Sequence, residues 1–325
     1  MHQSGRFAPV NLELFTILLY STLMQYVKTK TILSSYTDND RWFAYNYNMN
    51  LYRGCSHGCI YCDSRSECYH VDNFDTVRAK ENALSILEQQ LLKNPKKGII
   101  GVGAMSDSYN PFEKTKNLTR GALTLINTYR FGIGLSTKSD LAVRDIDIFS
   151  SIKTHSPAMM KFTITCTDDE LSQKIEPFAS PSSKRFKALY EFSKAGIYTG
   201  ILLMPILPFI NDTEQNIVSI VEKARDAGAS FIFPSPQRGF GVTLRQNQRD
   251  YFLEKAEFLY PGLKKRYIET YGTSYECTIP NNRKVFEAFA SACEQTGIIY
   301  RMPDIVRNFT APYIVSSPKQ LSLFQ

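Results

Sequence analysis

The feature that most constrains the fold is an alternation of short apolar runs with longer amphipathic stretches, which starts near residue 47. The apolar runs predict buried strands at 47–51, 99–104, 132–136, 161–165, 199–204 and 229–233. The stretches between them predict helices near 75–93, 117–130, 144–153, 182–195 and 212–227. Six such units in succession need crossovers between parallel strands, so we expect an α/β fold with a parallel sheet. Ligands of such sheets bind at the carboxyl ends of the strands.

After residue 240 the strand patterns stop. Helical patterns near 246–259, 262–271 and 282–296 predict a helical C-terminal appendage over residues 241–302. Residues 303–325 are typical of a loose tail. We therefore expect a β/α unit over residues 26–240, an appendage and a tail, not two domains of equal size.

The N-terminal residues 1–25 form an extension to which the sequence assigns no role. The apolar run 12–24 carries Glu13 and is shorter than the roughly 20 residues that a membrane span needs. One Arg precedes this run and no small-residue cleavage site follows it, so it is a poor signal peptide. We expect a soluble, cytoplasmic protein with no membrane partner. A second explanation of the N-terminal extension is that translation starts at Met24.

Composition excludes two other classes of protein. A chain of 325 residues with 43% hydrophobic and 21% charged residues can bury a core without disulfides and is not a disordered chain. Its seven cysteines are an odd number, which argues against a fully paired secreted framework. The net charge of +7 permits contact with nucleic acid without requiring it.

Three cysteines follow the first predicted strand with the spacing C-x3-C-x2-C: Cys55, Cys59 and Cys62. Three ligands do not complete a tetrahedral zinc site, although Cys68 or His57 could supply a fourth. Three thiolates do suit a [4Fe–4S] cluster that leaves one iron open. Gly54 and Gly58 suit a loop that wraps tightly around a cluster. Cys166, Cys277 and Cys293 are isolated, and we expect them to be packed. Cys68, six residues past the loop, could be a thiol near the site or a packed one, and we favour the second.

The motif, with the aromatic Tyr61 just before its last cysteine, resembles the radical S-adenosylmethionine (SAM) superfamily. This resemblance implies a partial (β/α)6 radical SAM barrel with a C-terminal helical appendage. It also implies two cofactors, SAM and a [4Fe–4S] cluster whose open iron chelates SAM. Reductive cleavage of SAM would then give a 5′-deoxyadenosyl radical that abstracts hydrogen from substrate, with electrons from a flavodoxin- or ferredoxin-type donor. Tyr61 would pack beside the cluster as a catalytic residue.

Four further segments, at 105–112, 136–140, 162–169 and 204–205, resemble the spore photoproduct lyase-like branch, which is related to DNA repair photolyases. All four follow predicted strands. The resemblance implies a set of SAM contacts: side chains of Ser106, Asp107, Lys138 and Thr163, and the backbone of Tyr61 and Met204. A carboxylate at Asp107 facing the SAM ammonium and a cation at Lys138 facing its carboxylate or ribose would be charge-assisted partners.

One position departs from that branch. Ala104 lies two residues before the Ser106–Asp107 pair, where the lyase carries a cysteine that donates hydrogen. The absent thiol argues against repair of the spore photoproduct itself.

The end of the chain contains a second motif. Gln320, Leu321, Leu323 and Phe324 belong to the run QLSLF, which is similar to the pentapeptide by which bacterial replication and repair proteins bind the DNA polymerase sliding clamp. An extended tail that binds a preformed groove is a common mode of recognition. The alternative is that these apolar residues fold back onto the protein.

Three functions follow from these observations. The first is a radical SAM enzyme that acts on nucleic acid, such as a damaged or modified DNA base. Basic residues of the C-terminal part would contact phosphates if they shared a face with the barrel mouth: Arg245, Arg249, Lys264, Lys265, Arg266, Arg283 and Lys284. The second is a radical SAM enzyme with a protein or small-molecule substrate. The third is a non-catalytic iron–sulfur or zinc protein.

Overall fold

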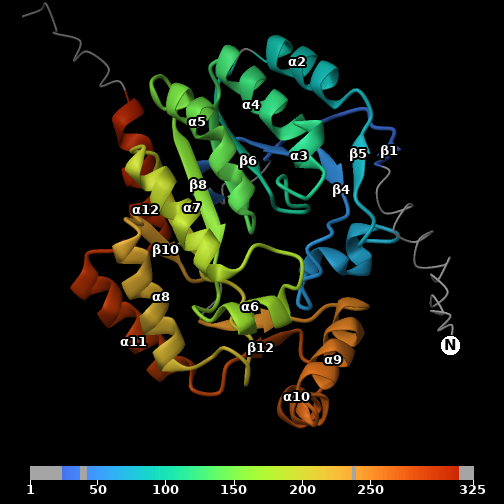
Figure 1. Ribbon diagram of the computed structural model, residues 1–325, viewed down its shortest axis with the longest axis vertical. Coiled ribbons are helices and arrows are strands. Elements are labelled where there is room, and N and C mark those ends of the chain that lie inside the picture. The colour runs from blue at the N-terminus through green and yellow to red at the C-terminus, as the bar shows by residue number, and fades with distance from the viewer. Residues whose placement is uncertain (1–23, 37–41, 95, 236–238, 315–325) are drawn as a thin grey trace, which may run out of the picture.

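The computed structural model describes residues 24–36, 42–94, 96–235 and 239–314. Its central sheet has the strand order β10-β9-β8-β7-β6-β3-β2 (Figure 1). The strands are β2 (Leu33–Ser35), β3 (Tyr47–Met49), β6 (Ile99–Val102), β7 (Gly132–Thr137), β8 (Ala158–Thr163), β9 (Tyr198–Leu202) and β10 (Phe231–Phe233). All six predicted strands are present and run parallel to their neighbours, while β2 pairs antiparallel to β3. The predicted α/β class and partial barrel are confirmed.

Helices cover the outer face of this sheet. They are α2 (Ala83–Lys93), α4 (Leu118–Thr128), α5 (Ile146–Lys153), α7 (Ser182–Lys194) and α8 (Glu214–Asp226). Two shorter helices, α3 (Glu113–Lys116) and α6 (Asp169–Ile175), follow β6 and β8, and Ile175 of α6 packs with the cysteine loop. Alternate strand residues such as Ile133 and Leu135 of β7 pack against them. The predicted helix at 75–93 begins later, because β5 (Arg78–Lys80) pairs instead with β1 (Gln25–Val27) and β4 (Tyr52–Arg53).

The inner face of the sheet is filled at the amino end of the strands by aromatic side chains. Phe231 and Phe233 of β10 pack there with Phe43, from the 3-10 turn η1 (Trp42–Ala44). The other 3-10 turns are η2 (Asp63–Arg65), η3 (Glu67–Tyr69), η4 (Asp140–Asp145) and η5 (Ala311–Tyr313). This apolar plug closes the amino end of the partial barrel and leaves the carboxyl ends of the strands for a site.

The C-terminal part contains two strands that the sequence analysis did not predict. Strand pairing does not stop at residue 240, because β11 (Gly241–Thr243) and β12 (Glu276–Thr278) form an antiparallel pair. Three-residue strands are too short to show a periodic pattern. The predicted helices are present as α9 (Gln248–Leu259), α10 (Leu263–Tyr271) and α11 (Asn282–Thr296). Of these, α11 packs against α8 and so extends the outer helical layer (Figure 1).

The predicted loose tail is wrong for its first part. Residues of α12 (Met302–Thr310) form a helix whose Ile305 and Phe309 are buried in the apolar plug. The ring of Phe309 stacks on Tyr198 of β9 with a centroid distance of 5.8 Å. The apolar side chains at helical spacing therefore complete the barrel floor.

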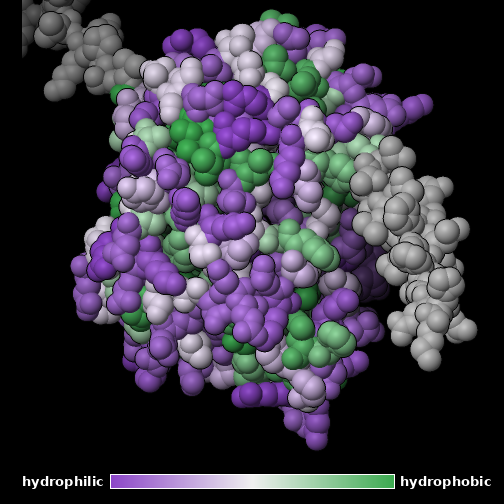
Figure 2. All heavy atoms as spheres, in the orientation of Figure 1, coloured by the Kyte–Doolittle hydropathy of each residue, from purple (hydrophilic) through white to green (hydrophobic). Residues whose placement is uncertain are grey.

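The proposed clamp peptide with Gln320, Leu321, Leu323 and Phe324, and most of the N-terminal extension, lie outside the described residues. Within the described part of the chain, every helix is too short or too polar to cross a bilayer. The face shown in Figure 2 is mainly hydrophilic, with hydrophobic residues in small groups.

Candidate active site

The three-cysteine loop lies between β4 and η2 and is held by its backbone. Gly54 and Gly58 have φ angles of +77° and +68°, which residues with a side chain rarely adopt. A Cβ atom at Gly54 would also lie 2.5 Å from the carbonyl oxygen of Thr76. The Cys55 N–H donates to the carbonyl of Phe74 at 2.8 Å. Both glycines thus allow the loop to wind tightly, as the sequence predicted.

The loop presents its thiols to one cavity. Cys55, Cys59 and Cys62 all line it, and burial raises the pKa of Cys55 to about 12 and also raises the pKa of the other two thiols. Burial therefore keeps these sulfurs protonated, whereas a bound metal deprotonates a coordinating thiol. Among the described residues, no three His, Cys, Asp or Glu side chains stand close enough to share one metal ion. Thiolates of an iron–sulfur cluster bind different irons and need not converge on one point.

The side chain of Tyr61, within this loop, is held by a buried ion pair. Its hydroxyl donates to Glu176, which pairs with Arg185 at 2.5 Å. Burial alone would raise the pKa of Glu176, but Arg185, Lys138 and the Tyr61 hydroxyl outweigh it and lower that pKa. Arg185 also donates to the carbonyl of Thr163 at 2.8 Å. One buried pair therefore fixes both the cysteine loop and the end of β8.

Ser106 and Asp107 lie together after β6, as predicted, but both already have protein partners. The Ser106 hydroxyl donates to the carbonyl of Gly54 at 2.5 Å. The Asp107 carboxylate accepts from the hydroxyl of Thr137 at 2.7 Å and from the backbone N–H of Lys138 at 2.8 Å. Asp107 thus joins the ends of β6 and β7, and a contact with SAM would have to share its oxygens.

The remaining predicted contacts line the same cavity, whose volume is about 440 Å³. They come from three strand ends: Lys138 after β7, Thr163 at the end of β8 and Met204 after β9. Such a volume is within the range of about 300–1,000 Å³ for small-molecule sites. The structure thus gathers every predicted cluster and SAM residue at the carboxyl edge of the sheet, and their individual roles remain predictions.

Comparison with known families identifies this arrangement. Residues 49–228 match the family model of the radical SAM superfamily. The chain belongs to the radical SAM superfamily. Membership is typical of enzymes and implies SAM and an iron–sulfur cluster, while it leaves the reaction unspecified.

Relatives by sequence cover part of this radical SAM chain. An uncharacterized protein of Methanocaldococcus jannaschii is 34% identical over 174 residues, which are 53% of this chain and 64% of that protein. An uncharacterized protein of Mycobacterium tuberculosis is 25% identical over 234 residues, which are 70% of this chain and 67% of that protein. The matches therefore span about two thirds of the length of these curated relatives.

Solved structures of spore photoproduct lyase share the fold of this radical SAM chain. A mutant of that lyase with bound AdoMet and dinucleoside spore photoproduct has a TM-score of 0.60 at 14% identity, over 90% of this chain and 85% of that chain. A second mutant gives a TM-score of 0.61 at 15% identity. At this identity the likeness shows the fold alone, and it confirms the structural relation expected from the sequence.

The cysteines outside the radical SAM loop differ in their surroundings. Cys166, Cys277 and Cys293 are buried, as predicted. Cys68 is exposed, and its sulfur lies 3.9 Å from an Arg245 nitrogen, so the expectation that it is packed is wrong. Among the described residues that line the cavity, the only cysteines are the three of the loop. The position that departs from the lyase branch, Ala104, lines the cavity as well.

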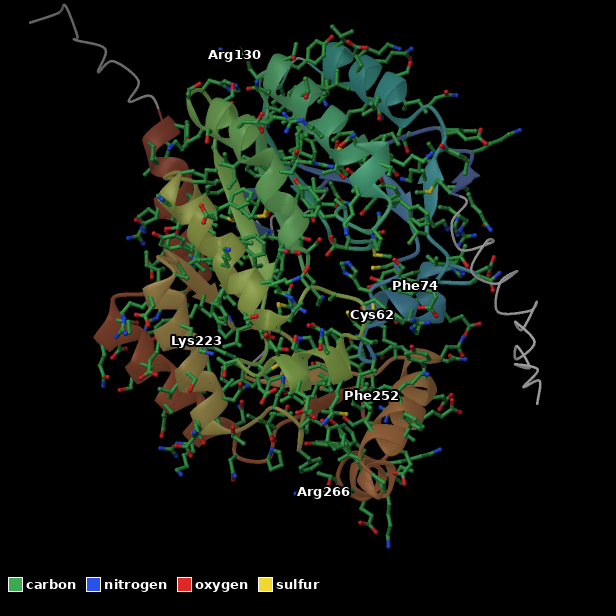
Figure 3. The ribbon with its side chains drawn as sticks, viewed as in Figure 1. Cys62, Phe74, Arg130, Lys223, Phe252 and Arg266 are labelled. Atoms are coloured by element: carbon green, nitrogen blue, oxygen red, sulfur yellow. The ribbon has the colours of Figure 1, made fainter. Side chains whose placement is uncertain are left out.

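The loop also packs against the C-terminal part. Cys59 and Tyr61 share an apolar cluster with Phe252 of α9 and Tyr267 of α10. Figure 3 shows Cys62 between the barrel and Phe252. The Gln248 side chain of α9 donates to the carbonyl of Tyr61 at 3.0 Å. The appendage therefore supports the site directly.

The sequence did not reveal Glu176, Arg185, Tyr45 or Lys161. The first two lie in and after the connection from α6 to α7, where no pattern indicates that they meet Tyr61. Lys161 is two residues before Thr163 on β8, so strand alternation alone places it on the same face. The sequence therefore contains a signal for the position of Lys161.

Proposed function

We propose that this protein is a radical SAM enzyme that binds a [4Fe–4S] cluster through Cys55, Cys59 and Cys62 and acts on a nucleic-acid base. When bound, the cluster supplies the electron that cleaves SAM to methionine and a 5′-deoxyadenosyl radical, which takes hydrogen from the substrate. The observation that carries the proposal is the shared cavity, which the three cysteines and the predicted SAM contacts all line.

The residues of the chain have distinct parts in this proposal. Lys138 supplies the cation for the carboxylate or ribose side of SAM, and the Thr163 hydroxyl binds beside it. Backbone groups of Tyr61 and Met204 recognise the adenine edge. Arg185 holds the Thr163 carbonyl at 2.8 Å and so keeps the β8 end in place. The apolar plug beneath the cavity excludes water from the radical.

Support for a nucleic-acid substrate comes from the fold and from two arginines. The lyase of the same fold was solved with a dinucleoside lesion. Arg245 and Arg249 line a second hollow, next to the cysteine loop, that also contains Cys68 and His70. Arg245 pairs with Asp63 at 3.0 Å, so this surface adjoins the cluster loop.

The other basic residues do not share that surface. Lys284 on α11 pairs with Glu214 of α8, and Figure 1 shows α11 and α10 on opposite sides of the C-terminal part. Figure 3 shows Arg266 on α10, away from Cys62. The proposed phosphate contacts are therefore limited to Arg245 and Arg249.

Anaerobic reconstitution with iron and sulfide tests the chemistry. We expect about four irons per chain, visible absorbance lost in Cys59→Ala, and 5′-deoxyadenosine after reduction with dithionite in the presence of SAM. Cys293→Ala is the matched control, because Cys293 is buried far along the chain in α11 and should leave the absorbance unchanged. An intact cluster that yields no 5′-deoxyadenosine would contradict the proposal. A chain that binds one zinc and no iron would favour the non-catalytic alternative.

Binding of oligonucleotides tests the substrate. We expect affinity to fall with rising salt and to fall further in Arg245→Ala/Arg249→Ala, with a smaller salt slope. Arg283→Ala/Lys284→Ala is the control, since these residues lie on α11. Oligonucleotide affinity that these arginines do not affect would favour the protein or small-molecule alternative. An electron donor of the flavodoxin or ferredoxin type is part of the proposal, with dithionite as its substitute in these assays.

A further inference from the structure

A lysine side chain is buried at the floor of the cavity. Lys161 projects from β8 into the cavity lining and is 1% exposed. Its ammonium donates to the hydroxyl of Tyr45 and lies 4.2 Å from the ring centroid of Phe43. Lysines are almost never fully buried unless they are paired, so this position needs a physical reason.

The partner Tyr45 occupies a slot that the sheet leaves open for it. Its ring crosses β6 and β7 at Gly101 and Gly134. A Cβ atom at either glycine would lie 2.3 Å from an atom of the ring. The missing side chains of two adjacent strands thus fix the tyrosine hydroxyl beside Lys161.

No counter-ion for Lys161 is found among the described residues. The register neighbours of Lys161 are Ser136 on β7 and Gly200 on β9, which carry no charge. No carboxylate of the described chain lies within ion-pair distance, and the titratable group that contacts the Lys161 ammonium is the hydroxyl of Tyr45. Burial alone lowers the pKa of Lys161 to about 7.

The direction from which a partner can come is restricted. Below Lys161 lies the apolar plug with Phe43, Phe231 and Phe233. An ammonium has three N–H donors, and the described residues accept one of them, at Tyr45. The remaining donors can be satisfied from the cavity, which is the space that the substrate would enter.

We propose that Lys161 and Tyr45 form a subsite that binds an anionic oxygen group of the substrate, either a carboxylate or a phosphate. Lys161 supplies the positive charge and N–H donors, and the Tyr45 hydroxyl, which accepts from Lys161, donates its own hydrogen to a second oxygen of the ligand. The inference rests on the radical SAM chemistry of the proposed function, since the ligand is the molecule that loses hydrogen. It adds that this molecule enters with its acidic group toward the cavity floor. A phosphate fits the nucleic-acid substrate, whereas a carboxylate would favour the small-molecule alternative.

The charge state of Lys161 gives a direct test. The reconstituted holoenzyme is prepared with lysine labelled with ¹³C at Cε, and NMR follows the Lys161 signal as pH rises. The signal is assigned by its absence from Lys161→Met, with Lys161→Arg as a second variant if the first does not fold. Titrations are repeated with sodium acetate, with inorganic phosphate, and with sodium chloride at equal ionic strength.

The proposal expects Lys161 to lose its proton near pH 7 without added anion. Acetate or phosphate should bind the charged form, so either one should raise the apparent pKa, by about one pH unit at roughly ten times its dissociation constant. A response to acetate alone identifies a carboxylate subsite, and a response to phosphate alone identifies a phosphate subsite. Tyr45→Phe should lower the affinity for the anion that responds by about tenfold, because one hydrogen bond to a charged group is lost.

Two results would overturn the subsite: a Lys161 signal that neither anion moves, or one that chloride moves equally. The signal of Lys187, exposed on α7, is the internal control and should not respond. Formation of 5′-deoxyadenosine by the wild-type protein is measured on the same sample. A wild-type protein that forms no 5′-deoxyadenosine refutes the proposed function. The response of the Lys161 signal to the anions then still decides whether the subsite exists.

Discussion

Glu176 shows how one buried carboxylate can hold an active site together. It is 1% exposed and binds both the Tyr61 hydroxyl and Arg185, which in turn holds the end of β8. Removing one charge of a buried pair leaves the other uncompensated. We therefore expect Glu176→Gln to lower the free energy of unfolding by about 3–5 kcal/mol, as measured by urea denaturation.

The control for this prediction is Glu170→Gln. Glu170 pairs with Lys174 at 2.6 Å on the surface of α6, so it presents the same kinds of charge with both side chains in solvent. Its replacement should change the midpoint only slightly. Equal effects of the two substitutions would show that the Glu176–Arg185 pair has no special structural weight.

Gly134 tests the slot for Tyr45 independently of any ligand. Because a Cβ atom there meets the tyrosine ring at 2.3 Å, we expect Gly134→Ala to destabilise the protein by about 1–3 kcal/mol. In a Tyr45→Ala background the same substitution should cost little, since the colliding ring is gone. Urea denaturation of the four proteins measures this coupling. Additive effects would mean that the glycine is required for another reason.

Sequence reasoning at the residue scale succeeded where spacing determines position. Cys55, Cys59 and Cys62 share a short loop, and Ser106 and Lys138 follow strands whose ends must meet in a parallel sheet. It failed for Glu176 and Arg185, whose contact with Tyr61 depends on how α6 and α7 fold back over the loop. Tertiary packing of that kind leaves no local pattern.

At the scale of elements, the long units were predictable and the short ones were not. Six strands and eight helices were expected from periodicity, and all have counterparts in the structure. The pair β11–β12 was missed because strands of three residues carry no detectable alternation. The helix α12 lies in the segment predicted as a loose tail, although Ile305 and Phe309 stand at helical spacing.

The helix α12 provides the prediction at this scale. Phe309 is 2% exposed and stacks on Tyr198, so Phe309→Ala should lower the free energy of unfolding by about 3–5 kcal/mol. Phe258→Ala on α9 is the matched control, because that ring is 84% exposed and little packing is lost. A Phe309 variant as stable as the wild type in urea would show that α12 docks without contributing to the core.

At the scale of the whole molecule, one cavity draws on most of the described chain. Its lining runs from Tyr36, before β3, to Thr243 on β11, and α12 closes the floor beneath it. The C-terminal part therefore belongs to the site in two places: α9 supports the cysteine loop, and α12 supports the floor. This arrangement explains why the substrate could not be inferred from the cysteine motif, which supplies only part of the cavity lining.

The predicted clamp-binding peptide is tested on the whole 325-residue chain. This chain should retain bacterial sliding clamp in a pull-down, because Leu323 and Phe324 would fill an apolar pocket while Gln320 binds at its rim. Leu323→Ala/Phe324→Ala should abolish retention, whereas Ser322→Ala, within the same run, should preserve it. Cluster content should be equal in all three proteins, which separates docking from folding. Equal recovery of clamp by wild type and by the double variant would refute the docking role and favour the alternative that these residues fold back onto the protein.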